Sequence, residues 1–299
     1  MKSLTQLTFF LLLIVTFQQL SAQNTYPLKA KIAQIVSQKQ ATVGVAISNI
    51  KDTNPTYLHK NRHFVMQSVF KLPIALFALH KVDQGKLSLD QKVQIKKEDL
   101  LPHTWSPIRE KYPNGTIMSL AKLIQYTVAQ SDNNGCDILL RMLGGPLQVE
   151  QYFHKIGIKN IAIKVNEETM HRDKKAQYKN WITPKAANKL LRLFYFNEKQ
   201  LLEKKTYTFI WGVLKATKTG PKKLRGQLPA DAVIAHKTGS SGQNDLGITT
   251  AENDIGVIFL PNGNPLFVSV FITASKETPD TNKQIIAEVA KAAWDYYTN

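Results

Sequence analysis

Apolar positions recur with different periods at the two ends of the chain and in its middle. Near the N-terminal end, 28–37 has helical periodicity, and 42–50 (TVGVAISNI) is rich in β-branched residues, as in a strand. A turn at Asn54-Pro55 separates this run from a short strand near 56–59. Toward the C-terminus, the pattern predicts three strands and a closing helix. These elements are expected at 232–237, 247–260, 266–274 and 281–297.

The pattern from residue 68 to about residue 217 predicts almost only helices. They are expected at 69–84, 118–129, 134–143, 148–156, 184–194 and 207–216. The segment 165–181 is polar and has no clear period, so it is interpreted as a long loop. Loops of that length in compact domains are often functional.

Strands at both ends around a helical middle predict an α/β fold, in which an antiparallel sheet is flanked by helices. Residues 23–62 and 218–299 would form the α/β domain, and 63–217 would form an inserted all-α domain. The 299 residues, 43% of them hydrophobic, can build a core without a disulfide framework or a structural metal. We therefore expect no metal and no cofactor.

Residues 1–22 resemble a signal peptide that is removed on export. A basic start at Lys2 precedes the apolar run 7–17 (LTFFLLLIVTF), and Leu20-Ser21-Ala22 offers a cleavage site. The alternative is a retained anchor, but the run is short and has no basic flank after it. The prediction is a periplasmic protein that is free of the membrane after cleavage.

The formal net charge of +17 first suggests nucleic acid or an acidic surface as a partner. The Lys and Arg residues are scattered, however, and no aromatic-interleaved basic segment occurs. We therefore predict a solvated basic surface and no nucleic-acid partner. Cys136, the single cysteine, cannot form an internal disulfide and is expected to be buried.

Three short motifs carry the candidate chemistry. Ser68 and Lys71 lie three positions apart at the start of a predicted helix, so that they share one face. A lysine in that position can accept the proton of the serine hydroxyl and activate it as a nucleophile. Ser131-Asp132-Asn133 lies between two predicted helices, and Lys237-Thr238-Gly239 ends a predicted strand before Ser240. Gly239 would leave room for the substrate to approach the strand.

Each motif alone is weak, because helix caps and basic strand ends often produce such matches. Together and in this order they are the signature of class A β-lactamases and penicillin-binding proteins. The chain resembles class A β-lactamases, and most closely the VEB- and PER-type extended-spectrum branch. The resemblance rests on MQSVFKLPIAL, LLPHTWSPIREKYPNG, SDNNGCDILLR, NEETMH and AHKTGSSG, and it extends over essentially the whole chain after the leader.

The resemblance implies a cleft between a helical and an α/β domain, in which a β-lactam is hydrolysed through a serine acyl-enzyme. Ser68 would be the nucleophile, and Lys71 and Ser131 would transfer protons. Glu167 would activate the water that releases the acyl group, with Glu168 as the rival carboxylate. Whether Lys71 or Glu167 accepts the first proton stays open.

The same resemblance implies a set of substrate contacts. The substrate-binding residues would be Trp105, Asn133, Lys237, Thr238, Gly239 and Ser240. The backbone amides of Ser68 and Ser240 would form the oxyanion hole. The partners would be small β-lactams, penicillins and cephalosporins that include expanded-spectrum ones, and the protein would be a monomer that confers resistance.

The chain also departs from the common class A pattern. Val165 replaces the arginine that usually opens the loop, Asp137 replaces an asparagine, and His171 stands where an asparagine commonly helps to hold the hydrolytic water. These changes put the position of that water in doubt. No arginine lies between Ser240 and Phe271 to support the substrate's carboxylate, and Lys223 is a candidate substitute.

Two other functions remain open at this point. A penicillin-binding protein shares the nucleophile chemistry but does not clear its acyl group efficiently. A non-catalytic basic binding protein is favoured only by the charge. Rapid turnover of a chromogenic cephalosporin would distinguish the hydrolase from both.

Overall fold

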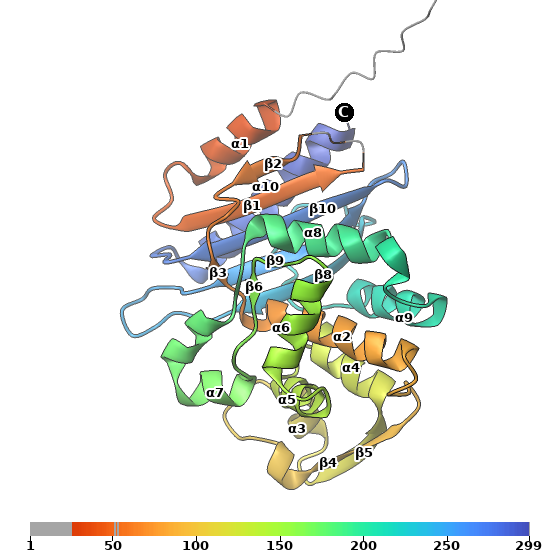
Figure 1. The fold of residues 1–299 in the computed structure, drawn as a ribbon. Helices are drawn as coiled ribbons and strands as arrows, with labels where there is room; N and C mark the ends of the chain where they lie inside the picture. The colour runs from red at the N-terminus through yellow and green to blue at the C-terminus, as the bar shows by residue number, and fades with distance from the viewer. Residues whose placement is uncertain (1–25, 51, 53, 299) are drawn as a thin grey trace, which may run out of the picture.

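A five-stranded antiparallel sheet joins the two ends of the chain, and this confirms the predicted fold class. The computed structural model describes residues 26–50, 52 and 54–298, so the predicted signal peptide lies outside the described residues. The sheet consists of β1 Thr42–Asn49, β2 Thr56–Leu58, β8 Val233–Ser240, β9 Glu252–Phe259 and β10 Pro265–Thr273. Their order is β2-β1-β10-β9-β8 (Figure 1), which leaves β8 at an edge.

Alternating side chains bury both faces of this sheet, because successive residues of a strand point to opposite sides. On β10, Val268 and Val270 pack in one core with α1 Tyr26–Val36 and α10 Pro279–Thr298. Phe267 and Phe271 of the same strand belong to the second core, toward α8 Pro184–Tyr195. The helix α8 therefore links the sheet to the helical part of the molecule.

The remaining helices gather on the α8 side of the sheet (Figure 1). They are α2 Lys71–Asp83, α3 Pro107–Lys111, α4 Leu120–Ala129, α5 Asn133–Met142, α6 Pro146–Lys155, α7 Glu167–Arg172 and α9 Lys204–Lys215. The helix α2 contacts α4, α5, α6 and α9 and is buried from Lys71 to Leu79. Within the described residues, no helix combines the length and the apolar character needed to span a bilayer.

The prediction of an almost purely helical middle was wrong in detail. Two short sheets are present there, one of β4 Lys92–Lys96 with β5 Gly115–Ser119, and one of β3 Phe64–Val65, β7 Trp181–Ile182 and β6 Ile161–Ala162. The strand β5 takes the start of the helix expected from residue 118, and Ser119 caps α4 instead. Strands of two to five residues contain too few alternating positions to be recognised from periodicity. The division into two domains stays a prediction.

The segment 165–181, predicted to be an irregular loop, contains α7 and the 3-10 helix η3 Lys174–Lys179. Both helices are six residues long, too short for a hydrophobic period to appear. In the last third, β9 begins at Glu252, five residues later than expected, because 241–251 form a turn that returns the chain to the sheet.

A close contact fixes the nucleophile segment against β8. A Cβ atom on Gly239 would lie 2.5 Å from the Met66 carbonyl oxygen and 3.1 Å from the Ser68 amide nitrogen. The neighbouring strand adds hydrogen bonds from Asn253 Nδ2 to the carbonyls of Val65 (2.8 Å) and Met66 (3.1 Å). This backbone packing requires a glycine at position 239, and the room that Gly239 leaves for a substrate stays a prediction.

Candidate active site

The turn that carries Ser68 is a 3-10 helix, η1 Gln67–Phe70, which leads directly into α2. In a 3-10 helix residues three apart lie above one another, so Ser68 and Lys71 face the same way. Gln67 has a φ of 45°, a backbone conformation uncommon for a side-chain-bearing residue. Strain of this kind is concentrated at functional sites.

Lys71 contacts two other candidate catalytic side chains and one candidate substrate-binding residue. Its Nζ donates hydrogen bonds to Ser68 Oγ at 2.7 Å and to Asn133 Oδ1 at 2.7 Å, and it forms an ion pair with Glu167. Lys71 is fully buried and Glu167 is 8% exposed. The predicted nucleophile, proton acceptor and deacylating carboxylate thus lie within one connected cluster, although up to 99 positions separate them in the sequence.

Asp137 places Glu167 at the start of α7. Its two carboxylate oxygens accept hydrogen bonds from the backbone amides of Glu167 and Glu168, both at 2.8 Å. Burial raises the pKa of Asp137 to about 7, against the opposing effect of these two amides. The residue that the sequence marked as a departure from the pattern is therefore a structural support of the loop.

Asn180 connects the two ends of the same loop. This buried side chain accepts hydrogen bonds from the amides of Lys164 and Val165 and donates one to the Val165 carbonyl, at 2.8, 3.1 and 2.9 Å. Asn180 was not among the residues predicted from the sequence. Its contacts span 15 or 16 positions, and no short motif marks them.

Lys237 reaches the second motif from β8. Its Nζ donates to Ser131 Oγ and to the Thr238 carbonyl, each at 2.9 Å. Burial, together with the nearby ammonium groups of Lys71 and Lys223, holds the pKa of Lys237 well below its usual value. Ser131 has a φ of 60° and is 8% exposed, so its hydroxyl is held in place between α4 and α5.

The outer edge of β8 has no neighbouring strand within the described residues, so the sheet does not use the backbone donors there. The Ser241 amide donates to Ala251 across the ladder at 2.9 Å. Because amides of an antiparallel strand alternate in direction, the amide of Ser240 must point away from β9. It therefore lies on the edge that packs against η1, where the Ser68 amide also lies.

A cavity of about 670 Å³ runs along this edge. Its lining includes Ser68, Trp105, Ser131, Asn133, Glu167, Thr238, Gly239 and Ser240. Trp105 is 56% exposed, and its Nε1 donates to the Gln130 carbonyl. Lys237 and Lys71 lie buried behind the surface.

A second cavity of about 350 Å³ adjoins the first at Gln67, Trp105 and Glu167. It lies between the α7–η3 segment and the turn after β8, and its lining includes His171 and Gly242. His171 is exposed on α7, one helical turn after Glu167. Among the side chains of the described ranges, no cluster of three or more His, Cys, Asp or Glu forms a candidate metal site.

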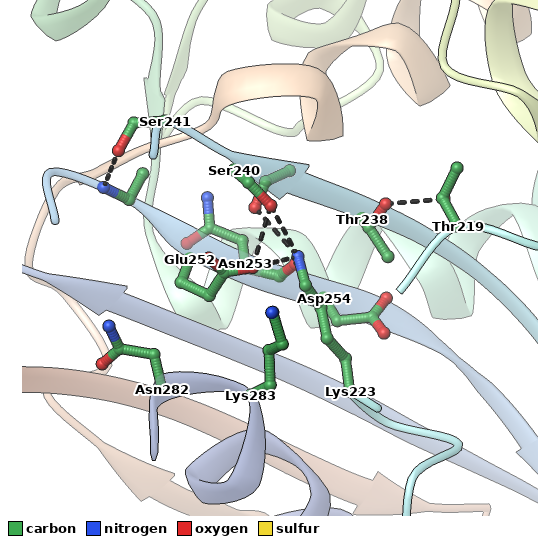
Figure 2. A network of polar contacts seen from close by, with 12 residues as sticks. Thr219, Lys223, Thr238, Ser240, Ser241, Glu252, Asn253, Asp254, Asn282 and Lys283 are labelled. Carbon is green, nitrogen blue, oxygen red and sulfur yellow. Dashed lines mark hydrogen bonds and ion pairs between the residues drawn. The ribbon is translucent and has the colours of Figure 1, made fainter. Parts of the chain in front are cut away.

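Lys223, the candidate substitute for a carboxylate-binding arginine, lines the 670 Å³ cavity but is paired within the protein. Its Nζ lies 2.5 Å from Glu252 Oε1 (Figure 2). No sequence motif marks Glu252. Lys223 therefore has a partner within the protein, and its contact with the substrate's carboxylate stays a prediction. Cys136 is buried as expected.

Comparisons with known proteins agree with this geometry. A model of the β-lactamase enzyme family matches residues 27–297. The chain is 49% identical to β-lactamase VEB-1 of Pseudomonas aeruginosa over 93% of each chain. It is 42% identical to the extended-spectrum β-lactamase PER-1 of the same organism, over 95% of this chain and 92% of that one. The solved structure of the TLA-1 extended-spectrum β-lactamase matches with a TM-score of 0.89 and 45% identity, over 92% of this chain and 99% of that chain.

The fold, the three motifs and these relatives define a serine hydrolase of β-lactams. The chain belongs to the β-lactamase enzyme family and, within it, to class A.

Proposed function

We propose that Ser68 attacks the β-lactam carbonyl and that the cluster of Ser68, Lys71 and Glu167 carries out both acylation and deacylation. Lys71 contacts both Ser68 Oγ and Glu167, and this single observation carries the proposal. An ammonium that donates to Ser68 cannot accept its proton until it has passed one on. Glu167 is the group in position to receive that proton, so the serine proton would reach the carboxylate through Lys71.

Ring opening would then proceed against the free edge of β8. The Ser68 and Ser240 amides would stabilise the negative oxygen of the tetrahedral intermediate. As the ring C–N bond breaks, Ser131 would protonate the leaving nitrogen and regain a proton through Lys237. Asn133 would bind the substrate's side-chain amide, and Thr238 with Ser240 would receive its carboxylate. Trp105 would form the wall of the cleft mouth.

Glu167 would act a second time, as the general base for the water that hydrolyses the acyl-enzyme. Its place at the junction of the two cavities leaves it in contact with solvent on the cleft side. His171 would help to order water in the second cavity. We also propose that this cavity admits the large acyl side chains of expanded-spectrum cephalosporins, which is supported by the similarity to the extended-spectrum β-lactamases PER-1 and TLA-1. Export to the periplasm and a monomeric state belong to the same proposal.

Mass spectrometry and a chromogenic cephalosporin test this mechanism together. Wild type should turn over rapidly and Ser68→Ala should not react. Glu167→Ala should form the adduct more slowly, because the relay loses its proton acceptor, but should still accumulate one covalent adduct per protein, because release loses its general base, with turnover reduced about 10³-fold.

Glu168→Ala is the matched control, because Glu168 is the next residue on α7 and forms an ion pair with Arg172. It should retain near-normal turnover. A Glu167→Ala enzyme that turned over normally would refute the role of Glu167, and a stable adduct on wild type would instead favour a penicillin-binding protein.

A further inference from the structure

A buried glutamate lies at the end of the cleft where the substrate's carboxylate would bind. Glu252 begins β9, is 4% exposed, and lines the 670 Å³ cavity together with Lys223 and Ser240. Figure 2 shows the three side chains converging at the end of β8.

The Lys223 ammonium has no hydrogen left for a ligand. It lies within hydrogen-bond distance of the Gly239 carbonyl (3.3 Å), the Asn253 carbonyl (3.1 Å) and Ser240 Oγ (2.9 Å), besides Glu252. An ammonium has three N–H donors, and these four acceptors already exceed them. Lys223 is 3% exposed, so water does not compete for it.

The Ser240 hydroxyl likewise has no hydrogen left to donate to a ligand. Its Oγ donates to Glu252 Oε1 at 2.8 Å, and a hydroxyl has one hydrogen to donate. An anion that arrives at Ser240 therefore meets an oxygen whose hydrogen points away, next to a carboxylate whose charge cancels that of Lys223.

We propose that Glu252 is a specificity-determining residue, which masks Lys223 and the Ser240 hydroxyl and so weakens recognition of the substrate's carboxylate. The inference rests on the proposed function of the cleft. The masking leaves Thr238, whose Oγ1 lies 2.7 Å from Thr219 Oγ1, and the buried Lys237 to provide most of the attraction. The masking makes hydrolysis depend less on the substrate's carboxylate than it would in a cleft with an unpaired cation.

The test compares a penicillin with its methyl ester, which lacks the anionic charge but keeps the reacting ring. The ratio of kcat/KM for acid to ester measures recognition of the carboxylate alone. Glu252→Gln should raise this ratio about tenfold, since removal of one like charge near the bound carboxylate at an effective dielectric of about 20 has an effect of that order. The change should be mainly in KM, and the ester rate should stay within about threefold.

Asp280→Asn is the matched control for charge. Asp280 also pairs with lysines near the cleft, Lys222 and Lys283, but it is exposed, so solvent and salt screen it. Its acid-to-ester ratio should change less than about twofold.

A double variant, Lys223→Met with Glu252→Gln, keeps the proposal testable if the single variant unfolds. Replacement of both members of a buried ion pair is tolerated far better than loss of one. Because the pair is self-neutralised, the double variant should keep the wild-type ratio within about threefold. A tenfold fall would show that Lys223 binds the carboxylate directly and would overturn the inference.

An unchanged ratio in folded Glu252→Gln would overturn it as well, as would an equal loss on acid and ester. In each of these cases wild-type hydrolysis still supports the proposed function. If wild type hydrolysed neither compound, the proposed function would fail and this inference with it.

Discussion

Two buried Lys–Glu pairs lie in the same cleft, and they differ in what surrounds the ammonium. Besides its ion pair with Glu167, the Lys71 ammonium donates hydrogen bonds to the side chains of Ser68 and Asn133. Lys223 instead contacts two backbone carbonyls of the sheet. A cation held by side chains can exchange protons with small movements of those groups. One held by a β-ladder keeps a fixed charge, so the first pair suits chemistry and the second suits recognition.

The two glutamates also differ in how firmly the surrounding backbone holds them. Glu167 lies on a six-residue helix that is anchored by Asp137, whereas Glu252 lies in a strand between two neighbours of the ladder. Both glutamates line the same cavity, so the difference lies in the backbone. The short helix α7 can shift if Lys71 is removed, whereas β8 and β10 hold the strand of Glu252 on both sides. Loss of one lysine should therefore affect mainly catalysis, and loss of the other mainly stability.

The largest expected effect is that of Lys71→Met on acylation. The second-order rate of acyl-enzyme formation should fall about 10³-fold, because the Ser68 hydroxyl loses its hydrogen-bonded partner that can relay the proton. Stopped-flow mixing with a chromogenic cephalosporin measures this rate. A fall of less than about tenfold would mean that Glu167 activates Ser68 without Lys71.

Lys223→Met should have its main effect on folding. The free energy of unfolding should decrease by about 3 kcal/mol, because Glu252 is left as an unpaired buried charge. Denaturant titration measures this loss, and hydrolysis of a penicillin methyl ester by the folded fraction should stay within about threefold of wild type. If ester hydrolysis fell as far as it does in Lys71→Met, the contrast between the two pairs would be wrong.

The smallest expected effect concerns the support of the catalytic loop by Asp137. The pKa of this carboxyl is raised to about 7, so the folded state binds its proton more tightly than the unfolded chain does. Its contribution to stability is therefore greatest below the unfolded pKa, near 4, and is lost as the pH rises to about 7. Asp137→Asn should remove this dependence.

The Asn variant should also slow deacylation about tenfold at neutral pH, because an amide group has one oxygen where two backbone amides need acceptors. Thermal melting from pH 4 to 8 and the rate of loss of the acyl adduct test both effects. An identical pH profile of stability in the two proteins would contradict the assignment.

The helices and long strands could be predicted because their side chains repeat over many residues. The two short sheets could not, since strands of two to five residues carry too little pattern. The start of β9 could not either, because the turn over 241–251 decides it. In the site, Ser68, Lys71, Ser131 and Lys237 belong to short motifs whose spacing is local. Asn180 and Asn253 belong to none, and their importance lies in single contacts with distant backbone groups.

The sequence by itself determined the kinds of element, the three motifs and their order, because those depend on neighbours within a few positions. Only the tertiary structure decided which charges meet. Lys223 and Glu252 are brought together by the approach of the loop before β8 to β9, and Asp137 meets the amides of α7 because α5 and α7 are in contact. The sequence gives the charge of a side chain. The effect of that charge depends on burial and on the partner it contacts, and both are properties of the packed fold.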